Sequence, residues 1–400
     1  MSAVASLSND RSVIKILHVI TTVGRGGAER QLVNLISNTD RSRFEHTVAF
    51  LRKPDDFVPD IEAAGAKAIC LDVKAKTPWI QAAWKLRQLI KSEEPAILHT
   101  WLYDANISAR LASLFSSRIP SIVSLQNADY ETTTVESANL SHTKVRVIKY
   151  IDKVSARWTR PTFVACSEFV RHSASKHLGL RESKVELIYN SVDPQGMTAT
   201  VAAVDELRES LEIPPDAFVF LNIGRLDPQK GQPVLLKAFK KVADRMPKAY
   251  LVILGHGPLK DSLSGLAGEL GLSERVRMPG ARPNVGAFLA LADVFVFPSF
   301  FEGLPLALIE AMSKGLPCIV SEIETLGEVV KDEDTGSLVS PGNEDQLAQA
   351  MVEMYENPAK RKSLGERALN EVNRKFHISA TIKQWEALYS QKASMGSITE

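Results

Sequence analysis

Short β-branched segments alternate with amphipathic helical segments from one end of this chain to the other. The first cycle runs from Val13–Ile20 through a glycine-containing turn into a helical pattern over Ala28–Ser37. Strands that alternate with helices of about ten to fifteen residues are typical of βαβ units, whose strands are parallel. The pattern therefore predicts an α/β protein built from doubly wound parallel sheets.

The alternation stops once, in a polar stretch that contains proline and glycine over residues 190–200, and restarts with the strand pattern Phe218–Ile223. A chain of 400 residues predicts two or three domains. We therefore expect a first Rossmann-like domain over 12–190 and a second over 200–372. A helical tail over 373–390 is expected to return to the first domain.

Charge and composition exclude several classes of protein. The 48 Lys and Arg residues nearly balance the 47 Asp and Glu residues, so the net charge of +1 argues against a nucleic-acid partner. Three cysteines without C-x-x-C spacing argue against a disulfide framework and a structural zinc site. The N-terminus lacks the apolar core of a signal peptide, and no run reaches the ~18 apolar residues of a membrane span. These features predict a cytoplasmic protein.

The turn after the first strand carries Gly26 and Gly27 immediately before a helix. Glycines allow close approach of a ligand to the backbone, and a helix N-terminus offers N–H groups to an anion. The dinucleotide fingerprint is broken, because Glu29 stands where its third glycine would be, and the Gly-Lys-Ser/Thr of a phosphate-binding loop is absent. Two interpretations of this segment therefore remain, an anion-binding site and a turn whose glycines serve tight packing alone.

The second half opens with a strand followed by Gly224, Arg225 and, five residues later, Lys230. An arginine offers a fork of donors to phosphate oxygens, and a lysine a compact charge. Ligands of open parallel sheets bind outside the carboxyl ends of the strands, where this loop is expected to lie. The pair is therefore a candidate phosphate clamp, and the alternative is two solvated surface cations.

The most specific signal follows the predicted strand Val294–Phe297. Glu302 precedes a helix that Pro305 is suited to begin, and Glu310 lies inside that helix. At a rise of ~1.5 Å per residue, Glu310 is roughly 8 Å along the axis from the helix start. This separation is too large for a shared proton and suits two hydroxylated parts of one long ligand, with a phosphate at the helix N-terminus between them.

Together these segments resemble the retaining glycosyltransferases of family 4, which have the two-domain GT-B fold. The matching pieces are Gly26–Glu29, Gly224–Gly231, Leu254–Leu259 and Phe301–Met312. The resemblance covers residues 12–390 and is strongest over 218–340. It implies an acceptor-binding first domain and a second domain that binds a nucleotide-sugar.

The resemblance also implies roles for individual residues. Arg225 and Lys230 would grip the diphosphate, and Glu302 would contact the transferred sugar; these three are the candidate catalytic residues. Glu310 would contact the ribose, and loops near residues 255 and 282 would frame the base. The donor-binding set is Gly26, Gly27, Gly224, Gly255, Arg282, Gly303, Leu304, Leu306 and Glu310.

The chain departs from the family pattern at one position. The family often has a histidine after the fifth strand of the first domain, where this sequence offers Gln126 and Asn127. An amide can donate a hydrogen bond to phosphate or sugar, but it carries no charge. His99, at the end of the preceding strand, is a separate candidate for the acceptor side, and a purely structural role for it is equally open.

No Asp-x-Asp pair follows a strand near these elements, and Asp332–Asp334 reads as a charged, solvated turn. We therefore expect no catalytic metal and no cofactor, with the nucleotide-sugar as co-substrate.

Residues 141–160 are the candidate segment for contact with the acceptor side. They hold six Lys or Arg residues and one acidic residue in an amphipathic helical pattern. Such a helix is typical either of an anionic membrane surface or of a domain helix whose basic face is solvated. The resemblance implies a retaining hexosyltransferase with a nucleotide-diphosphate-sugar as donor and a lipid-linked or polysaccharide acceptor in cell-surface glycan synthesis. A UDP-sugar is favoured over a GDP-sugar, and the sequence leaves the base open. A GT-B nucleotide-sugar epimerase and a non-catalytic sugar-nucleotide-binding protein are the alternatives.

Overall fold

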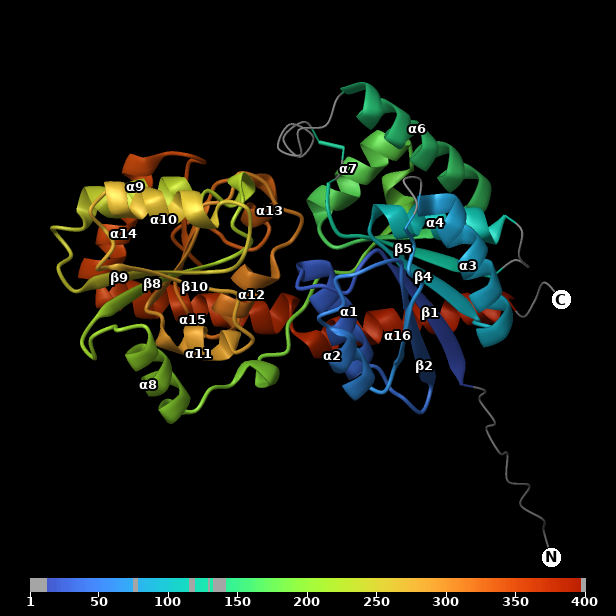
Figure 1. Cartoon of the computed structure of the whole chain (residues 1–400), viewed down its shortest axis with the longest axis horizontal. Helices are drawn as coiled ribbons and strands as arrows, with labels where there is room; N and C mark the ends of the chain where they lie inside the picture. Colours follow the sequence, from blue (N-terminus) through green and yellow to red (C-terminus); the bar gives the residue numbers. More distant parts are fainter. Residues whose placement is uncertain (1–12, 75–77, 115–118, 129, 132–141, 397–400) are drawn as a thin grey trace, which may run out of the picture.

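The structure is a computed structural model that describes residues 13–74, 78–114, 119–128, 130–131 and 142–396. Its strands form two parallel sheets, which belong to two α/β domains lying side by side (Figure 1). The first sheet has seven strands in the order β3-β2-β1-β4-β5-β6-β7, and the second has six in the order β10-β9-β8-β11-β12-β13. Both sheets agree with the parallel architecture that the alternation of strands and helices predicts.

The first domain contains the elements β1 (Ile14–Ile20), α1 (Gly27–Asn38), β2 (Phe44–Phe50), α2 (Val58–Ala63), β3 (Lys67–Cys70), α3 (Pro78–Glu93), β4 (Ile97–Trp101), α4 (Tyr103–Ser113), β5 (Ser121–Leu125), α6 (His142–Thr159), β6 (Thr162–Ala165), α7 (Glu168–Leu178), η1 (Glu182–Lys184) and β7 (Val185–Leu187). The segment that follows holds the short helix η2 (Gln195–Met197). Among the described residues, no helix combines the length and the apolarity that crossing a bilayer requires.

The second domain contains the elements α8 (Val201–Ser210), β8 (Phe218–Ile223), η3 (Pro228–Lys230), α9 (Gln232–Val242), β9 (Ala249–Leu254), α10 (Lys260–Glu269), β10 (Val276–Gly280), α11 (Val285–Leu291), β11 (Val294–Phe297), α12 (Leu306–Ser313), β12 (Cys318–Ser321), α13 (Glu324–Gly327), β13 (Ser337–Val339), α14 (Glu344–Glu356) and α15 (Pro358–Lys375). The strand order reverses between β8 and β11, as it does between β1 and β4 in the first sheet. Open sheets bind ligands at such points, so the loops after these strands are where a site is expected.

The chain passes between the two domains twice, and the two passages touch. Val192 donates its backbone N–H to the carbonyl of Phe376 (3.1 Å), and Ile378 donates to the carbonyl of Val192 (3.0 Å). After the second passage, helix α16 (Ile378–Gly396) runs beneath the first domain (Figure 1). There Trp385 and Tyr389 are buried in the same core cluster as residues of β1 and α1.

Three buried histidines lie between the first sheet and α16. The indole of Trp101 can only donate, and it points at His18 Nδ1 (3.3 Å). The proton of His18 must therefore be on Nε2, which donates to His46 Nδ1 (2.9 Å). By the same logic His46 donates from Nε2 to Thr39 Oγ1 (2.8 Å). Both rings are held neutral by one directional chain of hydrogen bonds.

The third histidine, His99, completes this cluster. Its Nδ1 lies 2.7 Å from the hydroxyl of Tyr389, and its Nε2 lies 2.8 Å from Ser124 Oγ. Burial holds the pKa values of His18 and His99 well below the ordinary value and lowers that of His46 to about 4. The three imidazoles therefore act as neutral hydrogen-bonding parts of the core.

Candidate functional site

The loops after β8 and β11 are joined by hydrogen bonds at the carboxyl edge of the second sheet. Gln229 donates its side-chain amide to the carbonyl of Phe301 (2.7 Å), while the backbone N–H of Phe300 donates to the carbonyl of Gln229 (2.8 Å). Asn222, in β8, donates to the carbonyl of Val296 in β11 (2.8 Å). These bonds fix two motifs, which are about seventy residues apart in the sequence, as one unit.

That unit brings together two of the predicted catalytic residues. Lys230 Nζ donates to Glu302 Oε1 at 2.6 Å, and the two side chains are only 15% and 6% exposed. The ammonium also lies 5.2 Å from the centre of the Phe297 ring. A lysine has three protons to donate, so a buried Lys230 can neutralise Glu302 and still reach a phosphate oxygen.

Arg225, the third predicted catalytic residue, is held differently. Its side chain is 72% exposed, and its Nε contacts the carboxylate of Asp227, which is 5% exposed. Gln232 at the start of α9 donates to the backbone carbonyl of Arg225 (2.9 Å). The guanidinium is thus anchored through one nitrogen, while most of the side chain remains accessible to a ligand.

The predicted glycines lie where backbones approach one another. A Cβ added at Gly255 would come 1.8 Å from the carbonyl oxygen of Gly224, so the loops after β8 and β9 are in direct contact. The side chain of Lys230 borders Gly224 as well. Arg282 is exposed in the loop after β10, the edge strand, which lies two strands away from β8.

Helix α12 begins directly beside the Lys230–Glu302 pair. Gly303, Leu304 and Leu306 are buried around its N-terminus, which Pro305 caps in an extended conformation. Glu310 is partly buried in the second turn. Glu302, the predicted contact of the sugar, therefore lies just before this short helix. Glu310, the predicted contact of the ribose, lies within it, as the spacing of the two glutamates predicts.

Helix α1 of the first domain faces this region. Burial raises the pKa of Glu310, and the positive charge of Arg30 in α1 acts against that rise. Gly26 precedes α1 and Gly27 begins it, and a Cβ added at Gly27 would meet no atom within 4 Å. Burial also raises the pKa of Glu29, whose carboxylate accepts a hydrogen bond from Thr22 (3.2 Å).

The segment after β5 reaches the same place from the other domain. A Cβ added at Gly303 would come 2.1 Å from the carbonyl oxygen of Gln126 and 3.4 Å from Asn127 Cα. Gln126 is half-buried and Asn127 is exposed. The structure therefore brings the amide-bearing segment against the loop that carries Glu302.

His99 is the prediction that the structure contradicts. The side chain is fully buried, and both ring nitrogens are used by Tyr389 and Ser124. A strand-end position suggested access to an acceptor, but α16 covers this strand from below. His99 is a core residue and not an acceptor contact.

Among the described residues, no group of three or more His, Cys, Asp or Glu side chains is placed to hold a metal ion. Asp332, in the charged turn noted above, accepts a hydrogen bond from the backbone of Leu338 (2.8 Å).

Three charged residues that bear on the candidate site or on the contact between the domains were not predicted. Asp227 could have been found, because it stands two residues after Arg225 in the same loop. Arg30 and Glu328 could not, since their partners are distant in sequence. Glu328 accepts backbone hydrogen bonds from Glu168 (2.9 Å) and Phe169 (2.7 Å), so a carboxylate of the second domain caps α7 of the first.

Two family models match the chain. The one described as Glycosyltransferase Family 4 matches residues 25–195, and the one described as Glycosyl transferases group 1 matches residues 203–371. The chain is 26% identical over 395 residues to the UDP-Gal:alpha-D-GlcNAc-diphosphoundecaprenol alpha-1,3-galactosyltransferase of Escherichia coli, covering 96% of this chain and 98% of that protein. It is also 26% identical to the lipopolysaccharide core biosynthesis glycosyltransferase LpsE of Rhizobium meliloti, covering 92% of this chain and 96% of that protein.

Solved structures resemble the fold over nearly the whole chain. Anabaena Alr3699/HepE in complex with UDP-glucose superposes with a TM-score of 0.81 at 22% identity and covers 94% of this chain and 100% of its own. WaaG, described as a glycosyltransferase involved in lipopolysaccharide biosynthesis, gives a TM-score of 0.71 at 15% identity, with 92% and 98% covered. At these identities the likeness establishes the architecture alone.

Proposed function

Because the chain belongs to the family 4 glycosyltransferases and has their GT-B fold, we propose that it transfers a hexose from a UDP-sugar to a lipid-linked glycan acceptor, with retention and without a metal ion. The observation that carries this proposal is the buried Lys230–Glu302 pair beside the N-terminus of α12. One cation for a phosphate and one carboxylate for a sugar meet there. The exposed guanidinium of Arg225 belongs to the loop joined to them.

The proposed mechanism follows the charge that develops during transfer. When the bond between the anomeric carbon and the diphosphate breaks, its electron pair goes to the departing phosphate oxygen. Arg225, Lys230 and the N–H groups at the start of α12 would stabilise that oxygen, since preorganised donors are most effective where charge appears in the transition state. Attack by the acceptor hydroxyl from the same face would give retention, with the hydroxyl proton passing to the departing oxygen. Glu302 would orient the sugar, and Glu310 the ribose.

The relatives support the choice of substrates. The Escherichia coli galactosyltransferase is named for a UDP-sugar donor and for a sugar on diphosphoundecaprenol as its acceptor, and it is similar to this chain over 96% of the chain's length. The HepE structure was solved with UDP-glucose. A UDP-sugar and a lipid-diphosphate-linked acceptor, used in the synthesis of a cell-surface glycan such as lipopolysaccharide, are therefore the proposed substrates.

The same proposal includes contact with an anionic membrane through α6, at its cytoplasmic face. Three large apolar side chains of α6 point outward: Val147, Tyr150 and Trp158 are 53%, 68% and 70% exposed. Arg146 and Arg157, both exposed, lie next to them in the sequence. Aromatic side chains that alternate with cations fit the headgroup region of a bilayer.

The neighbouring helix α3 also exposes apolar side chains, whereas a contact with α7 draws one cation of α6 away from its outer face. Helix α4 packs against both α3 and α6, and Ile80 and Trp84 of α3 are exposed in the same helix layer. Lys149 is half-buried, and its Nζ is hydrogen-bonded to His177 Nδ1 (2.7 Å). It therefore contributes less positive charge to the outer face of α6 than its sequence position suggests. Residue 141, the first of the predicted basic segment, lies outside the described residues.

A two-stage experiment tests the enzymatic proposal. Thermal-shift measurements against UDP-, GDP- and ADP-sugars should give a shift with a UDP-sugar alone, because a ligand at 100 times its Kd stabilises by about 2.7 kcal/mol. Incubation of that donor with a lipid-diphosphate-linked sugar should then give an extended product with the donor's anomeric configuration, in excess EDTA. An epimerised nucleotide-sugar without an acceptor would favour the epimerase alternative, and binding without turnover would favour a non-catalytic protein.

A further inference from the structure

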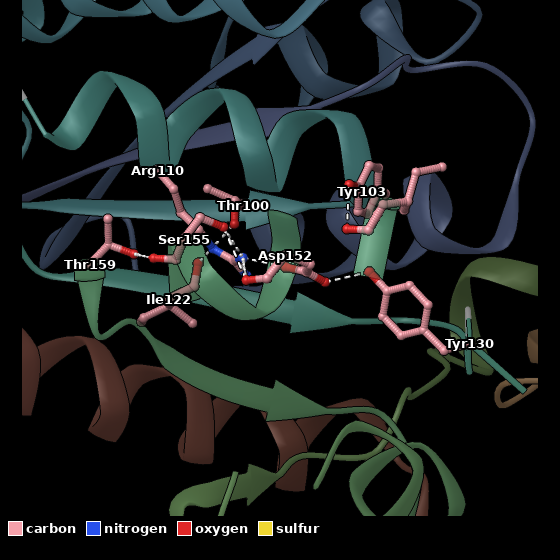
Figure 2. A network of polar contacts seen from close by, with 9 residues as sticks. Thr100, Tyr103, Arg110, Ile122, Tyr130, Asp152, Ser155 and Thr159 are labelled. Carbon is pink, nitrogen blue, oxygen red and sulfur yellow. Dashed lines mark hydrogen bonds and ion pairs between the residues drawn. The ribbon is translucent and has the colours of Figure 1, made fainter. Parts of the chain in front are cut away.

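A buried ion pair joins α4 to α6 in the first domain. The guanidinium of Arg110 in α4 is 3% exposed and contacts a carboxylate oxygen of Asp152 in α6 (Figure 2). The same Nη1 also lies within hydrogen-bonding distance of the backbone carbonyl of Asp152 (3.2 Å) and of Ser155 Oγ (3.1 Å). A buried carboxylate held in this way has a fixed orientation, because moving it would leave a buried charge without a partner.

The second oxygen of that carboxylate is used by a residue from outside the two helices. The hydroxyl of Tyr130 donates to Asp152 Oδ2 at 2.6 Å, and Figure 2 shows Asp152 between Arg110 and Tyr130. Tyr130 comes shortly after β5, on the segment that contains Gln126 and Asn127. The ion pair thus holds Asp152 Oδ2 in a fixed position, where it accepts the hydrogen bond from Tyr130 at the far end of that segment.

The near end of the same segment touches the loop of Glu302. The carbonyl oxygen of Gln126 lies so close to Gly303 that a Cβ there would come within 2.1 Å of it. Next to Tyr130, Glu131 donates its backbone N–H to the carbonyl of Ala128 (3.2 Å), and its carboxylate accepts a hydrogen bond from Ser173 Oγ (2.8 Å). The path of the segment therefore depends on side-chain anchors.

We propose that Tyr130, held by the Arg110–Asp152 pair, is a positioning residue that keeps Gln126 and Asn127 against the reacting end of the donor site. It links α6, the helix proposed to contact lipid, to the loop that carries Glu302. The kinetic part of this inference rests on the proposed function, whereas the structural part does not.

The test compares two tyrosine-to-phenylalanine variants in the full-length protein. Tyr130→Phe removes the hydroxyl that reaches Asp152. Tyr103→Phe is the matched control, because its hydroxyl donates to the carbonyl of Ile148 in the same α6 (3.1 Å) and does not belong to the segment after β5. Hydrogen–deuterium exchange of residues 126–131 and 302–304, melting temperature, and steady-state kinetics are measured for both.

In Tyr130→Phe we expect faster exchange in both stretches, a lower melting temperature because the buried Asp152 loses one hydrogen bond, and a kcat about tenfold lower (about 1.4 kcal/mol) at an unchanged KM for the donor. Tyr103→Phe should behave as the wild type. Unchanged exchange in Tyr130→Phe, or faster exchange with a wild-type kcat, would overturn the positioning role. If the wild type transfers no sugar, the proposed function fails separately, and the exchange comparison alone then decides whether Tyr130 anchors the segment.

Discussion

Acidification should destabilise this protein steeply, because its first domain encloses three histidines that must stay neutral. Protonating His18 would put a second N–H on the nitrogen that accepts from Trp101, and protonating His46 would do the same on the nitrogen that accepts from His18. His99 lies between two hydroxyls, of Tyr389 and Ser124, which could accept from a charged ring, but the side chain is fully buried, so burial disfavours the charge there. A charged ring therefore has no acceptable place in the folded state.

The size of the effect follows from the pKa values of the two states. An unfolded histidine titrates near ~6.5, whereas burial lowers the folded pKa of His46 to about 4 and those of His18 and His99 well below the ordinary value. Since the unfolded state binds more protons below pH ~6.5, the free energy of unfolding falls as pH falls through that value. Between pH ~7.5 and ~5.5 each histidine costs about 1.4 kcal/mol, or about 4 kcal/mol for three. That is a large part of the ~5–15 kcal/mol typical of a domain.

Guanidinium unfolding followed by tryptophan fluorescence at several pH values measures this dependence. His46→Gln should reduce the pH dependence by about 1.4 kcal/mol over the same interval, whatever it does to stability at neutral pH. His172→Gln, the same substitution at a side chain that is 64% exposed, is the matched control for the change of residue type. Buried carboxylates such as Glu310, whose pKa is raised, act in the opposite direction, but they are common to both proteins and cancel in the difference.

The reasoning is refuted if His46→Gln and the wild type lose stability in parallel between these pH values. Parallel loss would mean that the imidazole of His46 already takes up a proton in the folded state, which the directional chain of hydrogen bonds forbids.

Four further predictions concern the donor site and α6. Arg225→Ala should lower turnover by about 10²–10³ while the protein stays folded, with a lower melting temperature because the buried carboxylate of Asp227 loses its partner; wild-type turnover in a folded variant would refute its role. Lys230→Met should destabilise by about 3–5 kcal/mol, because it leaves a buried carboxylate unpaired, and adding Glu302→Gln should restore part of the loss; chemical unfolding of the two variants decides. Glu310→Gln should raise the Kd for the UDP-sugar, whereas Glu302→Gln should mainly lower kcat, and the reverse pattern in calorimetry and kinetics would exchange their roles. Trp158→Ser should reduce sedimentation with phosphatidylglycerol vesicles at low salt without changing donor affinity; no sedimentation of the wild type would contradict the membrane contact.

Local pattern was enough to predict the architecture and the sheet edge at which the candidate site residues lie. Alternating strands and helices predicted two parallel sheets, and the GT-B prediction is confirmed by the solved structures. Lys230 and Glu302 were expected at one cleft because both follow predicted strands, and ligands of such sheets bind outside the carboxyl ends of the strands. Their direct bond could not be predicted, since it depends on the paths of two loops that are far apart in sequence.

The failures have a common physical cause. His99 looked accessible at a strand end, but the helix that covers it comes from the other end of the chain. The apolar spacing of α6 was recognised, but periodicity does not say which face of a helix meets the sheet. Asp152 and Ala156 face inward, while Trp158 faces outward. The inward acid is stabilised by Arg110, a partner that no local pattern in the sequence indicates.

The return of α16 to the first domain sets an order for biosynthesis. Residues 378–396 are translated after the whole second domain, yet they supply Trp385 and Tyr389 to the core beneath β1 and β4. The core beneath the first sheet therefore cannot be completed, and its histidines cannot be covered, until translation of the second domain is finished. Cutting the chain between the domains would therefore remove a wall of the first domain's core along with the second domain.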